Sequence, residues 1–374
     1  MRMAPDSWFA SLRRLGWAPV PPLIGALCLV AAAQAQTLAP PSLGAPVRTR
    51  VVVAQRAPAM WILPMWVARA LGYFEQEGLE LKVNLYPDAD QAIKVVAEGG
   101  AQLGVNQTAH IVKMARAGHT SVAFAALAGQ WPSDLVIRTT VAQEKGITAD
   151  KPYVGRVAAL KGLRIGARPG MMTNLLREIL RSGGLAADTD VTIIDPGSNE
   201  GLVTALRAGQ LDAFVSFFPF TEVPVAEGIA QYLIRTARGE VPTVNGFLHT
   251  ALVASPEYLA QQPQVVQAAT RAIWRAQRYL YEHRAEALAL LQDRWRELLY
   301  DLPRPPGERV GRQLVALGFE AAYPSVPPNP AVGKEQLHTA MECLTRWEPT
   351  LQAFAWDSIA SNTAVEAVGA QPRR

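Results

Sequence analysis

The order of strand and helix signals, which occurs twice along the chain, is the feature that most restricts the fold. Short apolar runs typical of strands alternate with amphipathic stretches typical of helices, and turn residues separate them. In the first copy the expected strands cover 50–55, 81–85 and 102–105, and the expected helices cover 65–74 and 90–98. Strands that alternate with helices form parallel sheets that the helices cover. The sequence therefore predicts an α/β fold.

The second copy repeats this order further along the chain. It predicts strands over 163–167, 191–194 and 210–215, and helices over 173–181 and 202–208. Gly184-Leu185 precedes a strand as Gly78-Leu79 does, which makes the match specific in places. Common origin and ordinary α/β repetition both explain the match, and both predict two βαβαβ units. A loop-rich join is expected over 139–160.

The N-terminal segment has the pattern of a secretory signal peptide. Arg13 and Arg14 precede an apolar stretch over 23–33, which ends in Ala33-Gln34-Ala35. The alternative is an uncleaved membrane anchor, but this stretch is too short to cross a hydrocarbon core of about 30 Å. We therefore expect residues 1–35 to be removed by cleavage after Ala35 and the mature protein to lie outside the cytoplasm.

Composition and motifs exclude several classes of function. The formal net charge is +4, and no dense Lys/Arg stripe with aromatic residues is present, so we expect no nucleic-acid partner. The five histidines form no metal-ligand motif, and no G-x-S-x-G turn or phosphate-binding loop occurs, so we expect no catalytic residues, metal or cofactor. Cleavage would remove Cys28 and leave Cys343, which we expect to be a buried apolar residue rather than a reactive one.

Four motifs in the expected order resemble a known family, the bacterial periplasmic solute-binding proteins that serve importers for nitrate, sulfonates, taurine and thiamine-pyrimidine precursors. The motifs are Pro64-x-x-x-Ala68-x-x-x-Gly72-x-Phe74-x-x-x-Gly78-Leu79, Leu160-Lys161-Gly162-Leu163-Arg164-Ile165-Gly166, Ala205-Leu206-x-x-Gly209-Gln210-x-Asp212-Ala213, and Leu252-Val253-Ala254-Ser255-Pro256-Glu257-Tyr258-Leu259. They run from about residue 50 to 295, which is most of the mature chain.

The resemblance implies a type II periplasmic-binding-protein fold, in which two crossovers join two α/β lobes around a solute. Lobe 1 would comprise 48–138 and 246–360, lobe 2 would comprise 139–245, and 361–374 would be a frayed tail. The family's role implies a monomeric, non-enzymatic receptor that delivers a small solute to an ABC permease with a separate ATPase subunit. One alternative is a sensor that presents the solute to another receptor. The other is the fungal thiamine-pyrimidine synthase on the same fold, whose run of consecutive cysteines is absent here.

The solute is expected at the carboxyl ends of the strands, where open α/β sheets bind ligands. Arg56 and Arg168 follow the first strand of each unit and would pair with an anionic group, although each also fits a solvent-facing loop. Free backbone N–H groups at Thr108 and at Met172-Thr173 would suit anionic oxygens, although both threonines also fit simple helix caps. The candidates are Arg56, Trp61, Asn106, Gln107, Thr108, Trp131, Arg168, Met172, Thr173, Phe220 and Asn245.

Among these candidates, the aromatic residues bear on the kind of solute. Trp61, Trp131 and Phe220 would stack on a planar or aliphatic body, and Trp131 precedes the expected first crossover. Either Phe217 or Phe218 must be core, since adjacent strand residues point to opposite faces. His110 would reach the cleft or lie on a helix surface. This aromatic content favours an organic solute, sulfonated or heteroaromatic, over bare nitrate.

Overall fold

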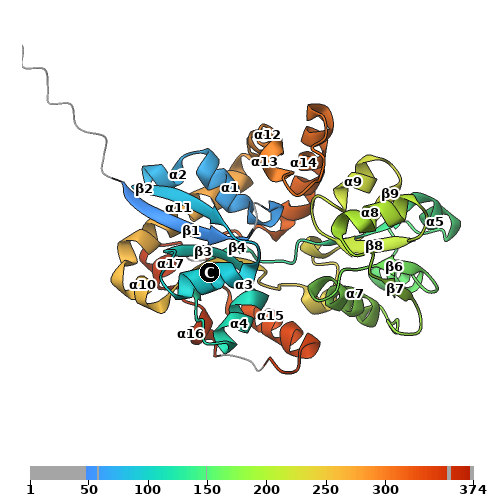
Figure 1. Ribbon diagram of the computed structural model, residues 1–374, viewed down its shortest axis with the longest axis horizontal. Coiled ribbons are helices and arrows are strands. Elements are labelled where there is room, and N and C mark those ends of the chain that lie inside the picture. Colours follow the sequence, from blue (N-terminus) through green and yellow to red (C-terminus); the bar gives the residue numbers. More distant parts are fainter. Residues whose placement is uncertain (1–47, 57–58, 149, 352–354, 371–374) are drawn as a thin grey trace, which may run out of the picture. The chain divides into compact units, whose positions relative to one another are not determined.

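The computed structural model describes residues 48–56, 59–148, 150–351 and 355–370. The expected signal peptide at 1–35 lies outside these residues. The chain divides into Met1–Pro46 and the unit Val47–Arg374, to which everything below refers. This unit contains two five-stranded sheets with helices packed around them (Figure 1). None of the described helices combines the length and the apolar character needed to cross a bilayer.

The first sheet has the strand order β2-β1-β3-β10-β4. Strand β1 pairs in parallel with β2 and β3, whereas β10 returns from far downstream and runs antiparallel to β3 and β4. The strands are β1 (Thr49–Gln55), β2 (Leu79–Leu85), β3 (Leu103–Gln107), β4 (Val122–Ala128) and β10 (Thr250–Ala254).

The second sheet repeats this arrangement, with the order β7-β6-β8-β5-β9. Strands β6, β7 and β8 are parallel, and β5 runs antiparallel to β8 and β9. The strands are β5 (Asp134–Arg138), β6 (Arg164–Gly166), β7 (Thr192–Ile194), β8 (Ala213–Ser216) and β9 (Ala230–Arg235). The repeated order in the sequence therefore becomes two sheets of the same topology, and the α/β fold is confirmed. Strand β5 begins upstream of residue 139, where lobe 2 was expected to start.

The helices of the two sheet regions follow the predicted alternation, with two differences. The expected helix over 65–74 is interrupted at Gly72, whose φ of 66° is left-handed. The expected loop-rich join contains two short helices. The elements are η1 (Met60–Ile62), α1 (Leu63–Ala70), α2 (Tyr73–Gln76), α3 (Ala89–Ala97), α4 (Thr108–Arg116), α5 (Thr139–Glu144), α6 (Tyr153–Ala158), α7 (Met171–Ser182), α8 (Asn199–Arg207), α9 (Glu222–Ala226), η2 (Thr236–Arg238) and η3 (Pro242–Val244).

A helical C-terminal region packs against the first sheet, and its long helix α11 contacts α1. Helix α17 also packs on α11, with Val365 buried, so the part of the expected frayed tail that the structure describes is ordered instead. The elements are α10 (Pro256–Gln261), α11 (Pro263–Glu282), α12 (Arg284–Gln292), α13 (Trp295–Leu298), α14 (Glu308–Ala322), η4 (Tyr323–Ser325), α15 (Lys334–Trp347), α16 (Trp356–Ile359) and α17 (Thr363–Ala367).

Two segments connect the sheets, one over 129–133 between β4 and β5 and one over 236–249 between β9 and β10. The segments are hydrogen bonded to each other: Gln130 Nε2 donates to Asn245 Oδ1 at 2.8 Å, and the Gly246 amide donates to Gln130 Oε1 at 2.8 Å. The two crossovers therefore lie side by side between the sheets, as Figure 1 also shows.

Candidate functional site

A cavity of about 400 Å³ lies where residues from both sheet regions meet beside the crossovers. Strands β1 and β3 are parallel neighbours, as are β6 and β8, so the carboxyl ends of each pair emerge at one edge. The lining residues are Arg56, Trp61, Asp88, Ala89, Gln107, His110, Trp131, Ser133, Arg168, Pro169, Met171, Met172, Asn199, Phe217 and His249. We call this space the central cavity.

The central cavity brings together six of the eleven residues that the sequence nominated. These are Arg56, Trp61, Gln107, Trp131, Arg168 and Met172. Asn106 lines a smaller adjoining space that shares Arg56, Trp61, Ala89 and Gln107 with the central cavity. The Asn106 side chain is buried, and both of its amide atoms have no hydrogen-bond partner among the described residues. A buried amide in this state is a candidate for contact with a bound molecule or water.

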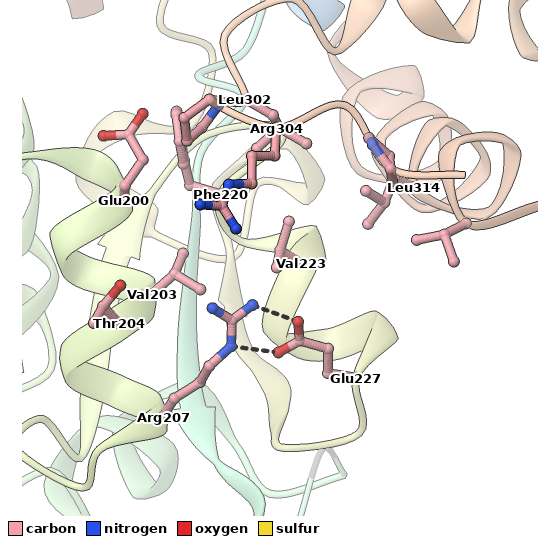
Figure 2. Close-up of a pocket in the computed structure, with 13 residues that line it drawn as sticks. Glu200, Val203, Thr204, Arg207, Phe220, Val223, Glu227, Leu302, Arg304 and Leu314 are labelled. Atoms are coloured by element: carbon pink, nitrogen blue, oxygen red, sulfur yellow. Dashed lines mark hydrogen bonds and ion pairs between the residues drawn. The ribbon is translucent and has the colours of Figure 1, made fainter. Parts of the chain in front are cut away.

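Phe220 and Asn245 are not among the residues that line the central cavity. Phe220 lines a separate, largely apolar cavity between α8 and α9 on one side and residues 302–314 on the other, as Figure 2 shows. Asn245 is exposed, and its side chain accepts the hydrogen bond from Gln130 that joins the two crossovers.

The two arginines that follow the first strand of each unit have different surroundings. The Arg168 guanidinium is paired with the Asp195 carboxylate, which also accepts a hydrogen bond from the Gly197 amide at 3.0 Å. Arg56 is exposed, and within the described part of the chain it makes no hydrogen bond or ion pair. Arg56 is therefore a cation at this cavity that forms no ion pair with a described carboxylate.

Backbone amides at the start of α7 are also available. Gly170, with a φ of 85°, leads into the helix, and no side chain caps it. The amides of Met171 and Met172 have no hydrogen-bond partner among the described residues, and both residues line the cavity. The N-terminus of a 12-residue helix with unpaired amides favours an anion.

The expectation of free amides at both threonines is wrong. The Thr108 amide donates to the His249 carbonyl at 2.9 Å, because β10 runs antiparallel to β3 and brings this carbonyl to the start of α4. The Thr173 amide and hydroxyl both donate to the Arg168 carbonyl, at 3.0 and 2.8 Å. The Thr108 hydroxyl is buried and has no partner among the described residues.

Aromatic rings form two walls of the central cavity. The Trp61 ring lies edge to face with Phe217, with ring centroids 5.3 Å apart. Trp131 is almost fully buried, packs against Phe247 at 4.7 Å, and donates from Nε1 to Ser133 Oγ at 3.0 Å. These contacts hold both indoles in place, so they present preformed apolar surfaces to a ligand.

His249 stands between the two walls and was not nominated by the sequence. Its ring centroid lies 5.8 Å from that of Trp61 and 5.4 Å from that of Trp131. Burial, with a smaller effect from His110, lowers the pKa of His249 to about 3. His110 itself lies 2.7 Å from the Asp90 carboxylate. A histidine just before a strand carries no local signal of function, and only the return of β10 beside β3 places it here.

The described residues contain no group of three or more His, Cys, Asp or Glu side chains that could hold a metal ion. Cys343 is buried in α15 and does not line the central cavity, and burial raises the pKa of its thiol to about 11. The cavity thus combines one unpaired cation, unpaired helix amides and aromatic walls, which suits the binding of an organic anion.

Curated proteins, solved structures and a family model all match this chain. YtlA of Bacillus subtilis (strain 168), provisionally named a binding protein, is 24% identical over 283 residues, which cover 73% of this chain and 75% of YtlA. The 4-amino-5-hydroxymethyl-2-methylpyrimidine phosphate synthase of Aspergillus parasiticus is 24% identical over 234 residues, or 60% of this chain and 64% of the synthase.

Among solved structures, the periplasmic aliphatic sulphonate-binding protein SsuA of Escherichia coli has a TM-score of 0.58 and 16% identity, and covers 80% of this chain and 87% of its own. This likeness confirms the periplasmic-binding-protein fold. A family model described as NMT1/THI5 like matches residues 60–287, more than half of the 374 residues. The chain therefore belongs to the NMT1/THI5-like family.

Proposed function

We propose that the protein is the solute-binding component of an ABC-type importer and that it captures a small organic anion in the central cavity. The observation that carries the proposal is a cavity lining that combines Arg56, which forms no ion pair, with Met171 and Met172, whose amides are unpaired, and with Trp61 and Trp131. A sulfonate head group would satisfy the cation and the amides, and an organic body would cover the indoles. The solute would then be delivered to a membrane permease.

The same proposal places the mature protein in the periplasm. Expression of the full chain in a Gram-negative host should yield a periplasmic protein whose N-terminus, determined by mass spectrometry, is Gln36. A product that keeps residues 1–35 and sediments with membranes would contradict the export part of the proposal while leaving the binding part open to its own test.

Binding is tested by titration calorimetry of the purified protein with 1-octanesulfonate, MOPS, taurine, nitrate and an aminopyrimidine. We expect the organic sulfonates to bind most tightly. Arg56→Ala should weaken sulfonate binding by about 10- to 100-fold, because it removes a charge-assisted contact. Arg309→Ala is the matched control, since Arg309 is an exposed arginine on α14. No measurable binding of any sulfonate would refute the proposed solute class.

The panel also separates the synthase alternative. Tight binding of the aminopyrimidine alone would favour the chemistry named for the Aspergillus parasiticus relative. We propose a receptor rather than an enzyme. A nucleophilic serine needs an adjacent base, whereas Ser133 in the cavity lining is hydrogen bonded to the Trp131 indole, which donates to its Oγ. Turnover of a bound pyrimidine by the purified protein would contradict this proposal.

A further inference from the structure

His249 is held at the junction of three elements that border the central cavity. Its amide donates to the Ala128 carbonyl at the end of β4, at 2.9 Å, and its carbonyl accepts from the Thr108 amide at the start of α4, at 2.9 Å. The imidazole lies between the Trp61 and Trp131 rings. Backbone and ring are therefore fixed before any ligand arrives.

The hydrogen bond on one side of the ring bears on its tautomer. Nδ1 lies 2.7 Å from the Thr250 hydroxyl oxygen. Thr250 is buried, and among the described residues its hydroxyl has a hydrogen-bond partner in His249 Nδ1. Nδ1 is the acceptor within reach of this hydroxyl, so the arrangement that satisfies Thr250 has its hydroxyl donating to Nδ1. In a neutral imidazole the remaining proton is then on Nε2.

The other side of the ring faces the central cavity. Nε2 has no hydrogen-bond partner among the described residues, and His249 is one of the residues that line the cavity. The low pKa of about 3 keeps the ring neutral through the range where proteins are ordinarily assayed. The charged or titratable side chains nearby belong to other positions of the lining, which are Arg56, Asp88, His110 and Arg168.

We propose that His249 determines the specificity of the central cavity by presenting a neutral Nε2–H donor, fixed by Thr250, to a hydrogen-bond acceptor of the ligand. The proposal rests on the proposed binding function and deepens it. A group that only accepts hydrogen bonds, such as a sulfonate or carboxylate oxygen, satisfies this donor. An ammonium or ring N–H at the same point would leave two donors facing each other, which costs affinity.

Two variants of His249 test its Nε2–H donor separately from the contact of Nδ1 with Thr250. His249→Asn retains an amide near the position of Nδ1, within reach of Thr250, and removes the group that reaches the cavity. His249→Gln places an amide N–H near the position of Nε2. With 1-octanesulfonate as the probe, we expect the Kd to rise about tenfold or more in His249→Asn and to stay within about threefold of the wild type in His249→Gln. Equal affinities of His249→Asn and the wild type would overturn the proposal.

The tautomer is tested in the wild-type protein, which keeps the proposal falsifiable where a variant does not fold. Long-range ¹⁵N–¹H spectra of histidine-labelled protein distinguish a protonated from an unprotonated ring nitrogen. For His249 we expect a protonated Nε2 and an unprotonated Nδ1 from pH 5 to 8. A proton on Nδ1, or two protons at pH 6, would overturn the proposal. Absence of sulfonate binding by the wild type would refute the proposed function, whereas this spectrum tests His249 separately.

Discussion

Glu222 is a fully buried carboxyl group on α9, outside the central cavity. Its oxygens accept hydrogen bonds from the Thr221 hydroxyl at 2.9 Å and from the Tyr232 hydroxyl at 3.4 Å. Burial, reinforced by the charge of Asp134, raises the pKa of Glu222 to about 7. Burial likewise raises the pKa of Asp134 to about 6. Folding therefore shifts both groups toward protonation relative to a solvent-exposed carboxyl.

This pKa shift predicts how stability depends on pH. A carboxyl whose folded pKa is raised contributes stability below its unfolded pKa, near 4.5, and that contribution is lost as the pH rises through about 7. Glu222→Gln mimics the protonated form, so we expect its free energy of unfolding at pH 8 to exceed that of the wild type by about 3 kcal/mol and to match it near pH 4. Urea denaturation at both pH values measures this. Glu366→Gln, at an exposed carboxyl, is the control, and an equal effect there would contradict the prediction.

At the same scale, the sequence predicted part of the candidate site. Parallel strands end at a common edge, so residues within two positions of the ends of β1 and β6, such as Arg56 and Arg168, could be nominated from the pattern alone. The sequence could not predict that Arg168 is paired and Arg56 is not, because the partner of Arg168 is Asp195, which lies in a turn 27 residues away. The amide of Thr108 and the ring of His249 likewise depend on the antiparallel return of β10, which local periodicity does not encode.

At the scale of elements, the fit between α14 and the loop after β8 depends on a missing side chain. Phe218 packs on Gly318 so closely that a Cβ at Gly318 would lie 2.1 Å from Phe218 Cδ2. Phe218 belongs to the core cluster that contains Phe319 and residues of the first sheet, although it follows a strand of the second sheet. This ring therefore joins the two sheet regions through α14.

Gly318→Ala tests that contact. The added methyl group forces Phe218 or α14 to move, so we expect a loss of about 1–3 kcal/mol in the free energy of unfolding, measured by urea denaturation. The gain in helix propensity, about 1 kcal/mol, offsets part of the cost. Gly155→Ala is the matched control: Gly155 lies in α6, has open space where its Cβ would be, and should be neutral or slightly stabilising. A stabilised Gly318→Ala would show that the contact is not tight.

The prediction of elements succeeded where periodicity was strong and failed where a tertiary contact decides. The alternation that predicted both sheets comes from apolar runs such as Val51-Val52-Val53, which need no partner to be recognised. The order of the fourth and fifth strands in each sheet depends on the pairing of β10 with β3 and of β5 with β8, between segments far apart in the sequence. The packing of α17 on α11 is also a contact between distant segments, so the local sequence of α17 gave no sign that it is ordered.

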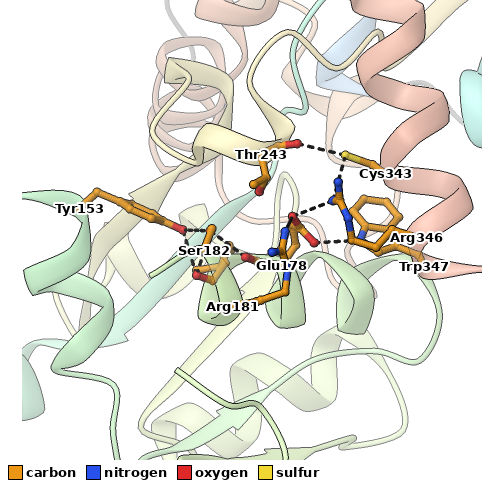
Figure 3. A network of polar contacts seen from close by, with 9 residues as sticks. Tyr153, Glu178, Arg181, Ser182, Thr243, Cys343, Arg346 and Trp347 are labelled. Carbon is orange, nitrogen blue, oxygen red and sulfur yellow. Dashed lines mark hydrogen bonds and ion pairs between the residues drawn. The ribbon is translucent and has the colours of Figure 1, made fainter. Parts of the chain in front are cut away.

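At the scale of the whole unit, a buried carboxylate joins α7 of the second sheet region to α15 of the C-terminal region. Figure 3 shows Glu178 surrounded by basic and indole donors. Arg346 Nη1 donates to Glu178 Oε1 at 2.9 Å, Arg181 Nη2 donates to the same oxygen at 2.5 Å, and Trp347 Nε1 donates to Oε2 at 3.4 Å. Burial alone would raise the pKa of Glu178, but Arg181, Thr243 and the charge of Arg346 outweigh it and hold the pKa below its usual value.

The contact connects to the central cavity from two directions. The first turn of α7, with Met171 and Met172, lines that cavity, and the carboxylate lies two turns further along the same helix. The Trp347 ring packs 5.4 Å from Trp131, which forms one of the cavity walls. The position of α7, and with it the amides offered to a ligand, therefore depends on a contact outside the cavity.

Glu178→Gln removes the charge that both arginines share. We expect the free energy of unfolding at pH 7 to fall by about 1–2 kcal/mol, because the buried carboxylate loses its charge-assisted hydrogen bonds, while solvent screens the two half-exposed guanidinium groups that remain. The pH dependence should be opposite to that of Glu222. Since the folded pKa of Glu178 is lowered, its contribution is present above the unfolded pKa and is lost as the pH falls through the folded pKa. The variant should therefore lose less stability than the wild type between pH 7 and pH 3.

Glu335→Gln is the control, because Glu335 is exposed and lies on the same helix as Arg346. It should leave both the stability and its pH dependence unchanged. Equal denaturation curves for Glu178→Gln and Glu335→Gln would mean that apolar packing, rather than this carboxylate, holds α7 against α15.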